Sequence, residues 1–253
     1  MEKQANILDF LPFKNPTKEQ EVALIGMADF VSNESQKDFL ILSGAAGTGK
    51  SSITTALVSF LNTADINYHI CAPTGRAARI IGRKSASWAT TIHSLIYKPE
   101  TNIETGVVTY NLKRNEDTEK MVFIIDEASM IGTSNSMGEN DLFRCKNGLL
   151  QDLILYIKMG NKNSKIVFLG DRNQLTPINE KVSQALEMSY LKNQLIKNSK
   201  MDSTEKHRYW ANSFGFFAFC LLLGIGIRSC NELDLEKEKT EQLKVQQKIN
   251  YKK

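Results

Sequence analysis

Residue types that can hold a phosphate group gather in one short stretch near the N-terminus, which fits the pattern G-x-x-x-x-G-K-[ST]. Gly44, Gly47 and Gly49 permit positive φ and close backbone approach, so consecutive N–H groups can point at phosphate oxygens. Lys50 supplies a positive charge for the β- and γ-phosphates, and Ser51 supplies a hydroxyl suited to Mg²⁺. The stretch therefore predicts a nucleoside triphosphate site with ATP and Mg²⁺ as its cofactors. The residues predicted to bind the cofactor here are Gly44, Ala45, Ala46, Gly47, Thr48, Gly49, Lys50 and Ser51.

The segments on either side of this loop have the composition of the strand and helix that such a loop needs. The apolar run Asp38–Leu42 predicts a buried strand, and a helix is predicted from about Lys50 to Asn62. The positive N-terminus of that helix would face the same anion. The alternative is a glycine-rich turn between a strand and a helix, without a ligand.

A second group of candidate residues follows the clearest apolar run in the chain. Residues 121–125 predict a strand that ends in the acidic pair Asp126 and Glu127. Asp126 has the sequence context of a carboxylate that completes Mg²⁺ coordination. Glu127 is placed to act as a general base toward the attacking water. The alternative is an acidic pair that merely starts a helix.

Upstream of the loop, a helix is predicted from about Thr17 to Ser32. Thr17 and Gln20 fit the capping box, in which the side chain at the third helical position returns to the N-cap amide. On the sequence alone this structural role of Gln20 is at least as strong as a role in ligand binding.

The remaining pattern predicts the fold class and the order of its elements. Apolar runs at residues 68–72 and 165–169 predict two more buried strands, and helical segments separate the strands. We therefore expect an α/β fold with a parallel sheet flanked by helices and with its ligands at the carboxyl ends of the strands. Residues 96–111 predict a small β-hairpin, residues 10–16 an extended entry segment, and residues 133–148 a mobile loop.

Composition narrows the compartment and the partners. A hydrophobic fraction of 42% is enough for a real core. Residues 192–253 carry 12 Lys and Arg against 7 Asp and Glu, while the rest of the chain carries 20 against 21. Net charge is therefore no argument for a DNA groove. Four cysteines without C-x-x-C spacing and only three histidines indicate reduced, cytoplasmic thiols rather than a zinc site.

Five motifs in one order resemble a known family. They are G-A-A-G-T-G-K-S, A-P-T-G-R-A-A, T-I-H-S-L, I-I-D-E-A-S-M-I and G-D-x-x-Q-L-x-P-I. This series is similar to that of superfamily 1 DNA helicases and looks most like the RecD-like and Dda-like 5′-to-3′ group, over about residues 11–191. The resemblance implies an ATP-dependent DNA helicase-type motor domain of the P-loop class. The hairpin lies where this family inserts a strand-separating element.

The resemblance also implies roles for single residues. Gln20 would contact adenine, Lys50, Asp126 and Glu127 would serve as described, and Gln174 would sense the γ-phosphate. Single-stranded DNA would be the partner, and its path would be lined by Thr74, Gly75, Arg76, Thr91 and His93. Alternatives remain open for two of these residues, since Arg76 has the character of a solvated helix face and His93 that of a buried, hydrogen-bonded histidine.

We expect a motor domain at residues 1–191 and a tail at residues 192–253. Members of the family continue into a second motor domain, so the chain resembles the first half of a motor. A separate chain supplying the second half, and a nucleotide- or DNA-binding module with little turnover, are the alternatives. Within the tail, residues 210–227 form an uncharged stretch at the lower length limit for a membrane span. A membrane anchor with the N-terminus inside, a buried core helix and a remnant of fusion or truncation remain open for it.

Overall fold

The computed structural model describes residues 6–32, 35–135, 143–177 and 180–200. The predicted tail stretch at 210–227 lies outside the described residues. The helices are η1 (Ile7–Phe10), α1 (Lys18–Val31), α2 (Lys50–Thr63), α3 (Gly75–Ser85), α4 (Ile92–Ile96), η2 (Ala128–Met130), α5 (Leu149–Gly160), η3 (Gln184–Leu186) and α6 (Met188–Lys200). The strands are β1 (Phe39–Ser43), β2 (Tyr68–Ala72), β3 (Ala89–Thr91), β4 (Tyr97–Thr101), β5 (Val108–Leu112), β6 (Val122–Ile125), β7 (Phe143–Cys145) and β8 (Lys165–Gly170).

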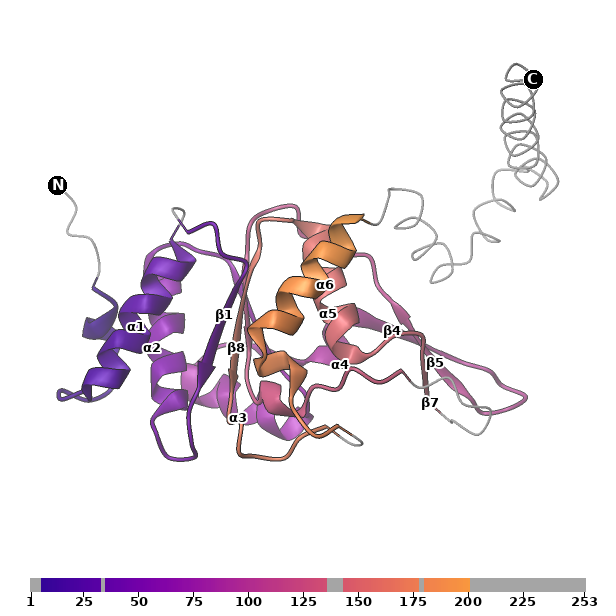
Figure 1. The fold of residues 1–253 in the computed structure, drawn as a ribbon, viewed down its shortest axis with the longest axis horizontal. Coiled ribbons are helices and arrows are strands. Elements are labelled where there is room, and N and C mark those ends of the chain that lie inside the picture. Colours follow the sequence, from indigo (N-terminus) through magenta and orange to yellow (C-terminus); the bar gives the residue numbers. More distant parts are fainter. Residues whose placement is uncertain (1–5, 33–34, 136–142, 178–179, 201–253) are drawn as a thin grey trace, which may run out of the picture. The chain divides into compact units, whose positions relative to one another are not determined.

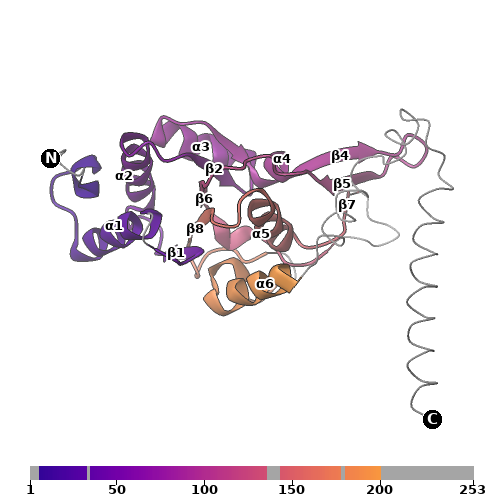
Figure 2. The same cartoon turned by 90° about the horizontal axis from the view of Figure 1, so that it is seen from above.

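The main sheet has five strands in the order β1-β8-β6-β2-β3, and every pair in it is parallel. The four apolar runs form β1, β2, β6 and β8, as the sequence predicts. Helices α1 and α2 lie on one face of this sheet, and α5 and α6 lie on the other (Figures 1 and 2). The predicted α/β fold with a parallel sheet between helices is therefore confirmed.

The core on the α1 and α2 side joins both helices to alternate residues of the central strands. Leu24, Leu57 and Leu61 are fully buried there against Ile124 of β6 and Leu169 of β8. Burial of a leucine side chain contributes about 1.5–3 kcal/mol. This packing fixes the start of α2 relative to the ends of β1 and β6, which carry the candidate site.

A second, smaller sheet has the order β4-β5-β7 and lies away from the main sheet (Figures 1 and 2). β4 and β5 are antiparallel and pair Tyr97 with Leu112 and Thr101 with Val108, with Gly106 at a φ of +70° in the turn. The predicted hairpin is thus confirmed.

One local prediction is wrong in part. Residues 143–145 of the expected mobile loop form β7, because β5 offers them a parallel partner, and residues 136–142 of that loop lie outside the described residues. The 3-10 helix η1, which no pattern predicted, precedes the extended entry segment, and Asn6 caps it by accepting a hydrogen bond from the Leu8 amide. Within the described residues, no helix is both long enough and apolar enough to cross a membrane.

Candidate nucleotide site

The loop between β1 and α2 has the backbone that a phosphate site requires. Gly47 and Gly49 have φ of +81° and +89°, a region that residues with a side chain rarely adopt. Gly44 does not have a positive φ. It is needed for space instead, since a Cβ there would lie 2.8 Å from the Thr48 hydroxyl. Thr48 in turn donates to the Ala45 carbonyl at 2.9 Å, which closes the loop.

The lysine and serine of the loop begin α2. The Lys50 ammonium donates to the carbonyls of Gly44 and Ala45, the second at 2.8 Å. The amide of Gly44 donates to the Gly170 carbonyl at 3.1 Å, so the start of the loop is tied to the end of β8. The charge of Lys50 and the free amides of the first turn of α2 face the same place. An anion at the loop would therefore meet two sources of positive potential.

Gln20 takes part in both α1 and the loop. Its Oε1 accepts from the Thr17 amide at 3.0 Å, and the Thr17 hydroxyl accepts from the Gln20 amide, so the predicted capping box is present. Its Nε2 donates to the Thr48 carbonyl at 3.0 Å. A cavity of about 460 Å³ opens between these two elements. Gln20 lines this cavity, where a group attached to the phosphates would lie.

The acidic pair follows β6 at the same edge of the sheet. The Asp126 amide still pairs with the Cys71 carbonyl of β2 at 2.9 Å, so the carboxylate stands where the strand ends. Burial, and then the Glu127 charge, raise the pKa of Asp126, while its hydrogen bond to the Glu127 backbone and the charges of Lys50 and Lys84 act in the opposite direction. Lys50 and Asp126 thus belong to one electrostatic site.

Glu127 has a left-handed backbone with φ of +52°. For a residue with a side chain this conformation costs of order 1–3 kcal/mol and gathers at functional sites. Glu127 is half-buried, and its left-handed backbone turns the chain from the end of β6 into η2, of which Glu127 is the N-cap. No sequence rule that we applied predicts this strain, because glutamate is not a usual residue for positive φ.

A hard cation such as Mg²⁺ fits the donors that lie here. Ser51 and Asp126 offer a hydroxyl and a carboxylate, and Mg²⁺ commonly takes one or two protein ligands together with phosphates and waters. A cation beside the half-buried Asp126 would favour its ionised form, which desolvation disfavours. In the described part of the chain, no cluster of three or more His, Cys, Asp and Glu is present.

Lys84, which sequence reasoning missed, lies beside these donors. Its ammonium reaches from the last turn of α3 and donates to the Ser51 hydroxyl at 3.1 Å. No motif marks this lysine, and only the packing of α3 on α2 brings it to the site. By contrast, Gln174 lies in the turn after β8 with its side chain exposed.

Four of the five residues predicted to line a DNA path lie at the ends of β2 and β3, and the fifth, His93, lies in α4. β2 and β3 pair Ala72 with Thr91, and a Cβ at Gly75 would lie 4.0 Å from the Thr91 methyl group. Thr74 and Thr91 cap α3 and α4 by accepting from the amides of Ala77 and Ser94. Thr74, Gly75 and Arg76 are all exposed on this edge.

His93 lies in an aromatic cluster at the base of the hairpin. Its ring centroid lies 5.7 Å from those of Tyr97 and Tyr110. Burial lowers the pKa of His93, which favours the neutral ring. The Tyr97 hydroxyl donates to Asp152 at 2.7 Å, which connects this cluster to α5. Packing thus explains His93 as well as a DNA contact would.

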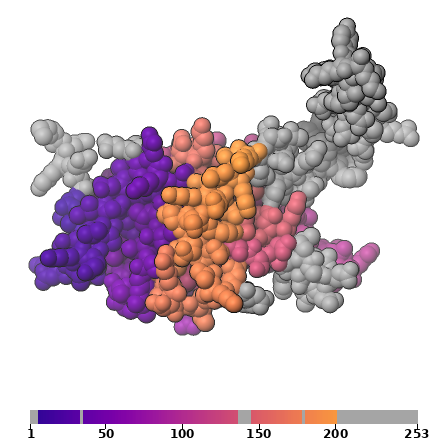
Figure 3. All heavy atoms as spheres, viewed as in Figure 1, coloured from indigo at the N-terminus to yellow at the C-terminus, as the bar shows by residue number. Residues whose placement is uncertain are grey.

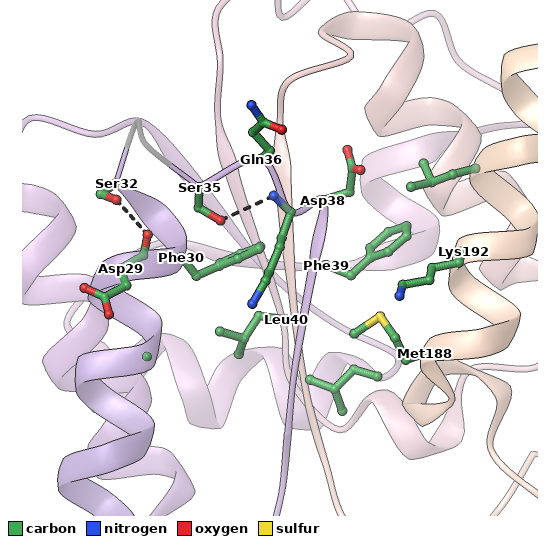
Figure 4. Close-up of a pocket in the computed structure, with 14 residues that line it drawn as sticks. Asp29, Phe30, Ser32, Ser35, Gln36, Asp38, Phe39, Leu40, Met188 and Lys192 are labelled. Atoms are coloured by element: carbon green, nitrogen blue, oxygen red, sulfur yellow. Dashed lines mark hydrogen bonds between the residues drawn. The ribbon is translucent and has the colours of Figure 1, made fainter.

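A larger cavity lies elsewhere. It measures about 890 Å³ and runs along β1 between α1 and α6, with Phe30, Phe39 and Met188 among its lining residues (Figure 4). In the space-filling view α6 lies in orange beside the N-terminal part of the chain (Figure 3). Neither the glycine loop nor the acidic pair lines this cavity. It is therefore not the predicted phosphate site, although it is the larger of the two cavities.

Comparison with known proteins shows that this chain is similar to ATP-dependent DNA helicases. Residues 28–180 match the family model described as "AAA domain". The chain is 28% identical over 140 residues to the ATP-dependent RecD2 DNA helicase of Deinococcus radiodurans, a match that covers 55% of this chain and 16% of that protein. It is 32% identical over 97 residues to the ATP-dependent DNA helicase dda of Enterobacteria phage T4, covering 38% of this chain and 22% of that protein. The matches thus span less than a quarter of the length of either relative.

Proposed function

Because the chain belongs to the AAA-domain family and is a superfamily 1 helicase-like motor domain, we propose that it binds ATP with Mg²⁺ and hydrolyses it in response to single-stranded DNA. Residues 1–191 would form the motor domain, with the β4–β5 hairpin as its insertion. Movement in the 5′-to-3′ direction is part of the proposal, on the resemblance to the RecD-like and Dda-like group. One observation carries it: β1 and β6 both pair in parallel with β8, so the glycine loop with Lys50 and the acidic pair follow strands that end at the same edge of the sheet.

Each residue of the site has a separate task. Lys50 would exchange its two carbonyl acceptors for oxygens of the β- and γ-phosphates, while the amides of the loop hold the phosphate chain. Ser51 and Asp126 would hold Mg²⁺, which neutralises the charge that develops on the phosphoryl group. Glu127, next to Asp126, would accept a proton from the attacking water. Gln20 would contact the base from the cavity between α1 and the loop.

The DNA side would use the exposed edge formed by β2 and β3. Thr74, Gly75 and Arg76 follow β2 and Thr91 ends β3, and hydroxyls, backbone amides and a guanidinium suit the phosphates of a single strand. His93 would join them from the first turn of α4. Gln174 follows β8, whose end is tied to the phosphate loop by the Gly44–Gly170 hydrogen bond. Through that turn Gln174 would pass the state of the γ-phosphate to the DNA side.

ATP hydrolysis with and without single-stranded DNA tests the proposal. The unchanged protein should turn over faster with DNA. Lys50→Ala should lose nucleotide binding, because the principal phosphate charge is gone. Glu127→Gln should still bind ATP with Mg²⁺ but hydrolyse it about 10²-fold more slowly or worse. Equal turnover with and without DNA would contradict the DNA-dependent motor, and unchanged ATP affinity in Lys50→Ala would contradict the site itself.

A further inference from the structure

The last turn of α3 is fixed against α2 by its backbone. The Thr55 hydroxyl of α2 donates to the Lys84 carbonyl at 3.2 Å. Ala86 ends the helix with φ of +50°, and the chain then returns so tightly that a Cβ at Gly82 would lie 3.0 Å from the Ser87 carbonyl oxygen. The position of Lys84 beside α2 is therefore set by main-chain packing as well as by its own side chain.

From this position the ammonium of Lys84 contacts the serine proposed for Mg²⁺. It donates to the Ser51 hydroxyl at 3.1 Å. Lys50, one residue before Ser51, is directed to the loop carbonyls instead. Lys84 is thus the lysine whose hydrogen bond goes to the serine of the site.

An ammonium and a magnesium ion at the same hydroxyl would oppose each other. Mg²⁺ needs its oxygen ligands at about 2.0–2.1 Å, and a lysine ammonium is a compact point charge. Two cations that share Ser51 would lie within a few ångströms of each other and repel, although solvent at the exposed Lys84 weakens the repulsion. Binding of Mg²⁺ therefore requires Lys84 to move away or weaken its hydrogen bond.

We propose that Lys84 takes the place of the metal at Ser51 when Mg²⁺ is absent, supports binding of metal-free nucleoside triphosphate, and competes with Mg²⁺ for the site. This inference rests on the proposed nucleotide site. Metal-free triphosphate carries more negative charge than its Mg²⁺ complex, and Lys84 supplies a counter-charge within the chain. The nucleotide would then bind first and the metal would enter second.

Titration of the whole chain with ribose-labelled fluorescent ATP, in EDTA and in a series of Mg²⁺ concentrations, tests this. Lys84→Met removes the charge and keeps the length of the stem. It should weaken metal-free binding about tenfold, the size of one charge-assisted hydrogen bond. The Mg²⁺ concentration that gives half of the maximal Mg²⁺-dependent change in ATP binding should also fall by about threefold or more, since the competing cation is gone. Lys84→Arg should retain metal-free binding.

Arg83→Met is the matched control, because Arg83 is an exposed residue in the same basic last turn of α3. It removes an equal charge from the helix end and should leave both quantities within about twofold of the parent. The proposal is overturned if Lys84→Met and Arg83→Met behave alike, or if Lys84→Met weakens binding equally with and without Mg²⁺. If the parent chain binds no nucleotide even with Mg²⁺, the proposed function itself fails, and this inference fails with it.

Discussion

Adding one methyl group at Gly49 should cost far more than adding it at Gly47, although both glycines belong to the same loop. Both have positive φ, and an alanine in that region costs roughly 1–2 kcal/mol. At Gly47 nothing lies within 4 Å of the new Cβ, so strain is the whole cost. At Gly49 the new Cβ would lie 2.7 Å from Nε2 of Gln20.

Gln20 cannot move away without loss, because both ends of its amide are bonded. Its Nε2 donates to the Thr48 carbonyl and its Oε1 accepts from the Thr17 amide. A hydrogen bond contributes about 0.5–1.5 kcal/mol and a helix cap typically about 1 kcal/mol. Gly49→Ala should therefore lower the free energy of unfolding by about 2–4 kcal/mol, and Gly47→Ala by about 1–2 kcal/mol.

Urea denaturation without nucleotide, followed by circular dichroism, measures both costs. A double-mutant cycle with Gln20→Ala isolates the clash. In the Gln20→Ala background, Gly49→Ala should cost only its strain, so the two changes should couple by about 1–2 kcal/mol. The same cycle with Gly47→Ala should be additive. Equal costs for the two glycine variants, or an additive Gly49 cycle, would refute the reasoning.

Three further predictions concern ionisable and buried groups. Burial and the Glu127 charge raise the pKa of Asp126 in the folded chain, so ionisation of Asp126 lowers the free energy of unfolding. The contribution of Asp126 to stability is greatest below its unfolded pKa and is lost as pH rises through its folded pKa. Asp126→Asn should thus raise the melting temperature at neutral pH and remove the loss of stability that accompanies ionisation of Asp126. An unchanged melting temperature would contradict this. Burial lowers the pKa of Lys165 to about 8 from 10.5, so between these pH values the unfolded chain binds more protons than the folded chain. Urea titrations should therefore show the free energy of unfolding of the parent rising with pH in that window, and no such rise for Lys165→Met. Tyr97→Phe should cost about 1–3 kcal/mol in the same titrations, because Oδ2 of the buried Asp152 loses the Tyr97 hydroxyl, while the Asn147 bond is at its other oxygen. A cost below about 0.5 kcal/mol would contradict this.

Local signals account for the parts of the fold that were predicted. Each of the four main strands is an apolar run long enough to be recognised, and the capping box at Thr17 is complete within four residues. β3 and β7 have only three residues each, and they are strands because β2 and β5 lie beside them. No pattern of their own could reveal them.

The candidate site divides in the same way. The glycine loop and the acidic pair follow from spacing, because phosphate binding depends on consecutive backbone groups. The contact of Lys84 with Ser51 spans 33 residues and depends on how α3 crosses α2, which no local pattern encodes. The double use of Gln20 is similar, since its capping role is local and its bond to Thr48 spans 28 residues.

The place of β1 in the sheet affects how firmly the phosphate loop is held. Within the described residues β1 pairs only with β8, and its other edge faces the cavity between α1 and α6. A strand with one neighbour opens locally at a lower free energy than a central strand, so hydrogen exchange should be faster at the amides of β1 than at those of β6. The glycine loop begins where β1 ends, so loss of β1 pairing would also release the loop. A nucleotide that binds only the closed loop would slow this exchange by mass action. Protection of the β1 amides from exchange would then report nucleotide occupancy at this edge of the sheet, without any label on the ligand.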